Sequence, residues 1–134
     1  MTKIPIEKSK YTIYLKKAEE YKRSMEASFQ NSDWNSCVGN SVHCAISASD
    51  ALCAFLLGLR NKGERHEEAI DLFRSIDVND ERIKKNSQRL GDLLSIKTDA
   101  EYGEKLLTQK EAEIAIQTAT RFFDFVKERI SEFV

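Results

Sequence analysis

Five polar side chains recur at helical spacing through an otherwise apolar stretch of the sequence. They lie at intervals of three and four residues, so a helix would place them along one side. The five are Ser36, Asn40, His43, Ser47 and Asp50. Such a stripe can hydrogen-bond a ligand or a partner chain. The same groups can instead satisfy polar side chains on neighbouring helices, including the tyrosines of the first predicted helix. The sequence leaves both interpretations open.

Metal and cofactor chemistry find no support in the residue pattern. The chain has two histidines, His43 and His66, and neither belongs to a His-x-x-x-His or Glu-x-x-His pair that holds an ion from one helix. No P-loop and no Gly-x-Gly-x-x-Gly loop is present to cradle a phosphate. We therefore expect no bound metal and no cofactor.

The cysteines are predicted to be structural. Cys37, Cys44 and Cys53 fall in one predicted helix, and the seven-residue separation of the first two places their sulfurs roughly 10 Å apart along the axis. That distance is too long for a disulfide. Alanine, valine and phenylalanine surround them in the sequence, whereas a nucleophilic thiol needs an electropositive setting. We expect reduced core cysteines and a cytoplasmic location.

Length and composition indicate a single soluble domain over residues 1–134. The hydrophobic fraction of 41% and charged fraction of 32% suit one compact core. The chain has 21 Lys and Arg against 22 Asp and Glu, which gives a formal charge of −1. Any phosphate-binding surface must therefore be a local cluster of positive charge. No apolar run reaches the roughly 18 residues of a membrane-spanning helix, and Met1 to Lys10 has no secretory core. We expect no membrane association.

One proline and five glycines leave long stretches free of helix breakers, which favours an all-α fold. The first helix is expected over about Glu7 to Gln30. Asn31-Ser32-Asp33 then supplies a break and an N-cap for a second helix ending near Leu59. That helix is apolar almost all round from Cys44 onward, which predicts the central helix of a bundle.

The remaining pattern predicts three further segments. After a tight connection at residues 60–65 comes a short helix, and a fourth helix opens near Asp80. The pattern weakens over residues 97–107, which indicates a bend. Thr108 to Glu111 then forms a capping box that opens a last helix reaching the C-terminus. These elements predict an up-and-down antiparallel bundle of four long helices plus one short helix.

Two surfaces of the predicted bundle stand out. Phe123, Phe125, Phe133 and Val134 add to the seam of the last helix, and this surplus apolar surface predicts a subunit interface and hence a homodimer. The fourth helix carries a basic stretch interleaved with acidic residues, which indicates a solvated face or else a surface that touches phosphates. Its basic members are Arg82, Lys84, Lys85, Arg89 and Lys97. The stem of Lys97 is expected to lie along the core, with its amine reaching solvent or a carboxylate.

Three segments of the sequence resemble the HEPN domain family. They are a lysine- and glutamate-rich helix at residues 14–21, the apolar central helix at 45–57 and a short helix opened by a histidine at 66–73. The resemblance covers most of the chain. It implies a dimeric helical bundle that binds nucleotide or RNA, in some members beside a nucleotidyltransferase partner or within a toxin-antitoxin pair.

Many members of that family are metal-independent ribonucleases with an Arg followed, four to six residues later, by a His. Arg60 and His66 match this motif with five residues between them, and Asn61 fills the position after the Arg that is often polar. As general base, His66 would take the proton of a ribose 2′-hydroxyl, while Arg60 would stabilise the charge on phosphorus. In family ribonucleases the motif usually lies later in the chain, and His66 can instead cap or pack its helix.

The leading prediction is therefore a stand-alone, homodimeric HEPN-like module that binds or regulates through nucleotide or RNA. A metal-independent endoribonuclease using Arg60 and His66 is the second interpretation. A purely structural protein, whose apolar seams serve only assembly, is the third.

Overall fold

The computed structural model describes residues 3–63 and 65–134. Met1, Thr2 and Glu64 lie outside the described residues; Glu64 is one of the spacer residues of the Arg60 to His66 motif. The described elements are β1 (Lys3–Pro5), a 3-10 turn at Lys8–Lys10, α1 (Tyr11–Gln30), α2 (Trp34–Leu57), β2 (Leu59–Asn61), α3 (His66–Arg74), α4 (Glu81–Ser95), α5 (Lys97–Tyr102) and α6 (Gln109–Ser131).

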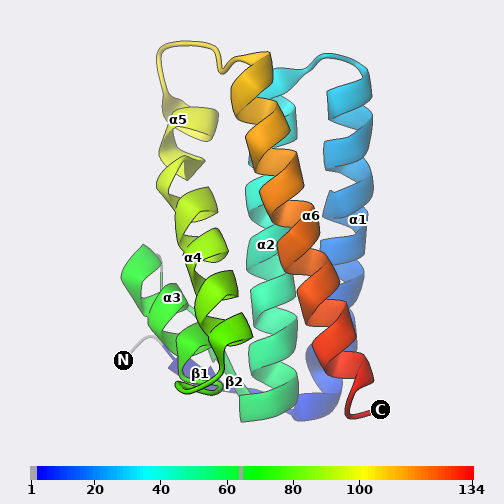
Figure 1. Ribbon diagram of the computed structural model, residues 1–134, viewed down its shortest axis with the longest axis vertical. Helices are drawn as coiled ribbons and strands as arrows, with labels where there is room; N and C mark the ends of the chain where they lie inside the picture. The colour runs from blue at the N-terminus through cyan, green and yellow to red at the C-terminus, as the bar shows by residue number, and fades with distance from the viewer. Residues whose placement is uncertain (1–2, 64) are drawn as a thin grey trace.

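The long helices pack as an antiparallel bundle around α2. Figure 1 shows α2 in the middle, with α1 on one side, α4 on the other and α6 lying across it. The short helix α3 packs against the lower part of α4, and α5 continues α4 upward. The predicted all-α bundle is confirmed. The structure adds the six-residue helix α5 in the region where the sequence indicated a bend.

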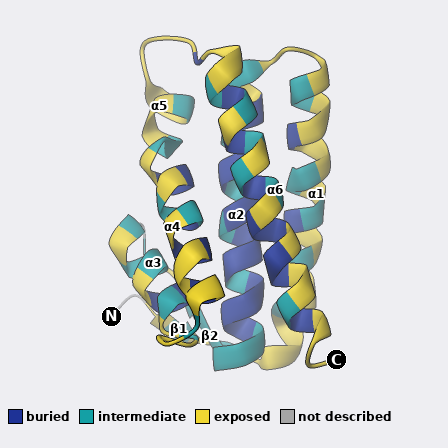
Figure 2. Ribbon diagram, viewed as in Figure 1, coloured by how far each residue is buried: buried dark blue, intermediate teal, exposed yellow. Residues whose placement is uncertain are grey.

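Helix α2 is the most deeply buried element of the described chain (Figure 2). Thirteen of its 24 residues are buried, among them all three cysteines, which are free thiols as predicted. By length and composition alone this helix could cross a membrane, contrary to the expectation that no apolar run is long enough. However, 61% of its most apolar window is buried against the other helices, as in the central helix of a soluble bundle.

The ends of α1 and α2 differ from the sequence-based prediction. Helix α1 begins at Tyr11, because Lys8–Lys10 forms a 3-10 turn. Asp33 precedes α2 but makes no side-chain capping hydrogen bond. At the other end, Gly58 has a φ of 64°, in the left-handed region that glycine adopts without strain, and it stops α2 at Leu57.

A two-stranded antiparallel sheet, absent from the prediction, follows this glycine. Strand β2 pairs with β1 so that Ile4 lies opposite Arg60, and the Ile6 N–H donates to the Gly58 carbonyl at 3.0 Å. Residues 59–61 are therefore a strand rather than part of a tight connection. The strand exists because the N-terminal segment returns to the end of α2, and sequence periodicity carries no signal for such a long-range pairing.

The surplus apolar surface predicted for the last helix is smaller than expected. Phe123 and Phe125 are each only 4% exposed. The cationic groups of Lys22 and Lys127 lie 5.9 and 5.8 Å from the ring centre of Phe123, and their stems help to cover it. The prediction that these two rings form a subunit interface is therefore wrong. Phe133 and Val134 remain exposed.

One side-chain amide on α2 connects this helix to α5 and to the segment that leads from α5 to α6. The Asn35 side chain donates to the Ala100 carbonyl at 3.1 Å and accepts from the Leu107 N–H at 2.7 Å. His43 Nε2 lies 2.7 Å from Glu101 Oε1. No residue of α5 is fully buried, although Ala100 packs against the core, so these polar contacts add to a small apolar contact in holding the helix against α2. They also set the position of Lys97, the first residue of α5.

The capping box at Thr108 is confirmed and provides a test of the last helix. The Glu111 N–H donates to Thr108 Oγ1 at 3.2 Å, and the Thr108 N–H donates to Glu111 Oε1 at 2.9 Å. Replacing Thr108→Ala removes one acceptor for the free N–H groups, so we expect the free energy of unfolding to fall by about 1 kcal/mol. Urea denaturation followed by circular dichroism measures the change.

The matched control is Thr118→Ala within the same helix. Its hydroxyl donates to the Ile114 carbonyl at 2.7 Å, a group already bonded inside the helix, so its removal should change stability little. Equal decreases in the two variants would show that the cap has no special role.

Candidate functional site

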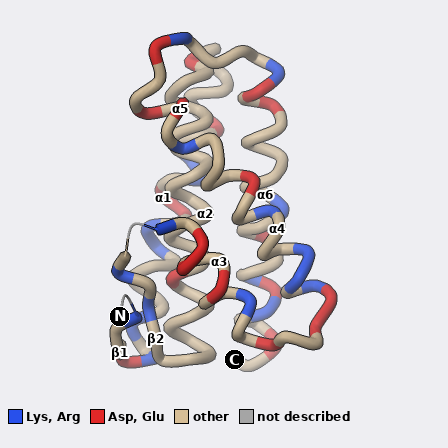
Figure 3. The backbone as a smooth tube through the Cα atoms, turned by 90° about the vertical axis from the view of Figure 1, so that its left-hand side faces the viewer, with Lys and Arg blue, Asp and Glu red and all other residues tan. Residues whose placement is uncertain are grey.

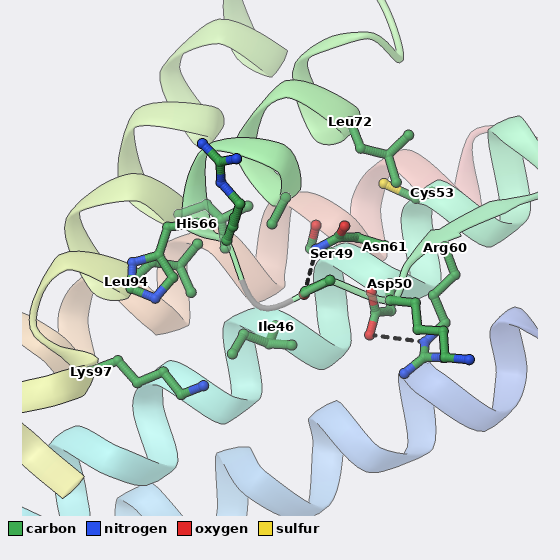
Figure 4. A pocket seen from close by; sticks show the side chains of 15 residues that line it. Ile46, Ser49, Asp50, Cys53, Arg60, Asn61, His66, Leu72, Leu94 and Lys97 are labelled. Atoms are coloured by element: carbon green, nitrogen blue, oxygen red, sulfur yellow. Dashed lines mark hydrogen bonds and ion pairs between the residues drawn. The ribbon is translucent and has the colours of Figure 1, made fainter. Parts of the chain in front are cut away.

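A pocket of about 180 Å³ opens between α2, β2, α3 and the α4–α5 junction (Figure 4). Its apolar floor combines residues from three helices: Ile46, Ala69, Leu72, Leu90 and Leu94. Its polar wall carries Asp50, Arg60, Asn61, Lys62, Arg65, His66 and Lys97. An apolar floor with a few convergent charged groups is the usual composition of a small-molecule site.

Three features of the fold position the polar side chains of the pocket. Pairing of β2 with β1 fixes the backbone of Arg60 and Asn61. Helix α3 begins at His66, so the imidazole lies in its first turn at the pocket. Docking of α5 on α2 brings Lys97 to the pocket, on the side of Leu94 and His66 (Figure 4). The pocket therefore depends on contacts between segments far apart in the sequence.

Arg60 is held by an acid and by an aromatic ring. Its Nε lies 3.6 Å from Asp50 Oδ2, and its guanidinium carbon lies 5.3 Å from the centre of the Tyr14 ring. Burial raises the pKa of the Asp50 carboxyl to about 6, because desolvation penalises the charged form more than the nearby Arg60 stabilises it. The pocket wall thus contains an acid whose pKa lies close to neutral pH.

One buried acceptor of the pocket wall, Asn61 Oδ1, has no hydrogen-bond partner among the described residues. The amide nitrogen of Asn61 is already used, since it donates to the Gly63 carbonyl at 3.2 Å. Arg60 Nε forms only the long contact with Asp50 described above. Because buried polar groups are nearly always paired, Asn61 Oδ1 offers an acceptor to a ligand.

The two residues of the predicted ribonuclease motif both line this pocket, but they lie on different sides of it. Figure 4 shows His66 beside Leu94 on one side and Arg60 beside Asp50 on the other. Arg60 is engaged by Asp50 and Tyr14, whereas no hydrogen bond or ion pair is found for His66 among the described residues. The structure therefore brings them to one cavity without placing them side by side.

The polar stripe of α2 divides between the pocket and the interhelical contacts. Asp50 lines the pocket. Closer to the N-terminal end of α2, the His43 ring stacks on Tyr21 with centroids 5.2 Å apart and bonds Glu101. The Asn40 amide donates to Ser28 Oγ at 3.2 Å. Ser47 is buried, with 8% of its surface exposed. Asn40, His43 and Ser47 do not line the pocket.

Sequence reasoning did not identify three cations of the pocket wall, Lys62, Arg65 and Lys97. The stem of Lys97 was expected to lie along the core, because Lys97 falls in helical register with Leu90 and Leu94. Its amine was expected to reach solvent or a carboxylate, and this register was the one signal of its position. In the structure that register places it beside the apolar floor (Figure 4). Lys62 and Arg65 are spacer residues between Arg60 and His66 and had no periodic pattern to mark them.

The pocket offers no thiol nucleophile, and the described residues offer no metal cage. Cys53 lines the pocket, but burial raises its pKa to about 12, so the thiol stays protonated near neutral pH. Within residues 3–63 and 65–134, no three His, Cys, Asp or Glu side chains are grouped to hold a metal ion. The chemistry available here is that of hydrogen bonds, cations, one imidazole and the Asp50 carboxyl.

Comparison with known proteins gives one informative match. A family model for the HEPN domain matches residues 11–129, from the start of α1 to near the end of α6. The matched region contains every residue of the pocket wall and floor. No curated protein matches the sequence significantly.

The raised pKa of Asp50 predicts a pH-dependent contribution to stability. The folded-state pKa of about 6 exceeds the ordinary value of 3.8, so the folded protein binds this proton more tightly than the unfolded chain does. The contribution is present below about pH 4 and disappears as pH rises through about 6, by up to about 3 kcal/mol. In Asp50→Asn this dependence is absent, so the stability of the variant relative to wild type should rise with pH.

Denaturation of both proteins across this pH range measures the difference. The attraction of Arg60 is already contained in the pKa of Asp50, and the guanidinium stays charged across this range, so Arg60 adds no second titration to the difference profile. The same change at exposed Asp92 controls for removal of a carboxylate in general. A difference profile for Asp50→Asn that is flat with pH would disprove the assignment.

Proposed function

We propose that this chain, which belongs to the HEPN domain family, binds a nucleotide, free or as part of RNA, in the pocket between α2, β2, α3 and α4. The carrying observation is the convergence of Lys62, Arg65, His66 and Lys97 on one pocket, beside a buried acceptor, Asn61 Oδ1, that has no partner among the described residues. The pocket therefore combines positive charge with an unused hydrogen-bonding group.

Each part of a nucleotide finds suitable chemistry in the pocket. The aliphatic floor, which includes Ile46 and Leu94, suits the face of a base or a ribose. The amine of Lys97 suits a phosphate as a point charge, and the imidazole of His66 suits it as a hydrogen-bond donor. Because the net charge of the chain is −1, attraction to phosphate must come from such a local cluster.

The family and the burial pattern support the wider parts of the proposal. HEPN domains are typically dimeric, and some accompany a nucleotidyltransferase, so we propose a homodimer of single-domain chains and a partner of that class. The buried, unpaired cysteines suit a reducing compartment, which supports a cytoplasmic location. Exposed Phe133 and Val134 are candidates for the subunit contact.

Mononucleotide binding to Lys97→Gln tests the pocket directly. Glutamine keeps most of the stem on the apolar floor and removes the charge, so we expect affinity for AMP, GMP, CMP or UMP to fall roughly tenfold. Isothermal titration calorimetry measures each nucleotide with wild type and variant. Lys110→Gln, at an exposed position at the start of α6, makes the same charge change outside the pocket.

The control should bind like wild type. If nucleotide affinity fell equally in the two variants, the change in net charge would explain the loss, and Lys97 would have no specific role. Failure of all four nucleotides to bind wild type would remove the pocket as a nucleotide site.

A metal-independent endoribonuclease is the second candidate, because Arg60 and His66 line the same cavity. Catalysis would require Arg60 to leave Asp50 and Tyr14 and approach the phosphate that His66 serves. The test is cleavage of mixed-sequence RNA in a chelator by wild type, Arg60→Ala and His66→Ala, each checked for folding. Cleavage abolished in both folded variants would establish the enzyme, whereas intact RNA with wild type supports a binding module.

A further inference from the structure

A second concave surface lies between α4 and α6, away from the pocket. It is a groove of about 320 Å³, and the residues that line it are Arg82, Lys85, Asn86, Arg89, Arg121, Asp124, Phe125 and Glu128. Helix α4 contributes to both sites with different residues, since Leu90 and Leu94 form the pocket floor. The helical spacing therefore puts the two sites on different sides of α4.

The groove carries an excess of positive charge. Four cations face two carboxylates along its lining. Arg82 is neutralised, with its guanidinium 3.0 Å from Glu128 and 3.8 Å from Glu132. Within the described chain, Lys85, Arg89 and Arg121 form no ion pair. Figure 3 shows the Lys and Arg segments along α4, which lies next to α6.

Arg89 is oriented by a buried amide. Asn86 is only 3% exposed, and its Nδ2 donates to the Arg82 carbonyl at 2.8 Å, which fixes the side chain. Its Oδ1 then accepts from Arg89 Nη1 at 3.1 Å. One nitrogen of the guanidinium is thus held in place, while its other donors stay available. A positioned guanidinium is better suited to phosphate than a freely moving one, because less side-chain entropy is lost on binding.

The groove has no platform on which a base could stack. Phe125 is 4% exposed, and the guanidiniums of Arg82 and Arg129 lie 5.1 and 5.0 Å from its ring centre. Its ring is therefore covered. Binding here would involve charge alone, and interactions with phosphate carry no direct sequence information.

We infer that the α4–α6 groove is a second anion site, which binds the phosphate backbone of RNA through Lys85, Arg89 and Arg121 without reading sequence. The inference rests on the proposed function in that RNA is the ligand. Binding at the pocket and binding at the groove can nevertheless be measured separately. A mononucleotide fills the pocket alone, whereas a longer strand also reaches cations outside it.

Fluorescence anisotropy with a labelled oligouridylate of about 20 nucleotides tests the groove. We expect the double variant Arg89→Gln with Arg121→Gln to raise Kd roughly tenfold at low salt. The slope of log affinity against log salt should become shallower by about 0.7 for each phosphate that the variant no longer neutralises. Mononucleotide affinity measured by calorimetry should stay unchanged.

The matched control is Lys84→Gln with Lys110→Gln. It removes the same charge from exposed positions that do not line the groove, and one of them lies on α4 itself. The control should keep the wild-type Kd and slope to within about twofold. Lys85→Gln, at an exposed position, repeats the test at a site where misfolding is not expected, and its Kd should also rise.

Each other outcome overturns a definite part of the inference. The groove is excluded if wild type does not bind the oligonucleotide, or if the double variant and its control bind alike. Polyglutamate of matched length that binds the groove as tightly as RNA would reassign it to an acidic protein. If mononucleotides fail to bind while the groove variants still weaken RNA binding, the groove stands and the pocket proposal falls.

Discussion

Burial of α2 on several sides is the constraint on which the rest of this structure depends. From Cys44 to Leu57 the helix is apolar almost all round, so one neighbouring helix cannot shield it. Each fully buried large apolar side chain contributes about 1.5–3 kcal/mol relative to exposure, which makes coverage by α1, α6 and α4 strongly favourable. Leu52 of α2, together with Phe73, Ile83 and Phe122 from other helices, is among the largest side chains that become fully buried.

The pocket forms where that coverage is incomplete. On the side of α2 that carries Ile46 and Asp50, the end of α4 meets the short elements β2, α3 and α5, and no long helix runs the full length of this side. Short elements bring fewer apolar side chains and more charged ones, so the gap has an apolar floor and a cationic wall. The Asp50 carboxyl lies at this boundary, buried enough for its pKa to rise and close enough to Arg60 to form an ion pair.

Local charge, rather than net charge, governs what this protein can bind. Salt screens exposed charges beyond about 10 Å, so clusters on different sides of one helix act separately. Many cations are neutralised within the fold, as Arg129 is by Asp80 at 2.9 Å. The cations that face the pocket and the α4–α6 groove without such partners are few, and they give a chain of net charge −1 two basic surfaces.

The sequence by itself determined the features that depend on neighbours along the chain. Helical periodicity predicted the antiparallel all-α bundle and the central place of α2, and the Thr108 to Glu111 spacing predicted the capping box. The motif residues Arg60 and His66 were also visible, with their likeness to the HEPN family. Each of these signals arises within about one or two helical turns, where residue type decides structure.

Only the tertiary structure decided which residues meet across the chain. The β1–β2 pairing, the Asn35 bridge to Ala100 and Leu107, and the burial of Phe123 and Phe125 all join distant segments. The same is true of Lys97 in the pocket and Arg121 in the groove. These placements follow from how whole helices pack, and packing depends on the shapes of all the partners together, which no local pattern in the sequence records.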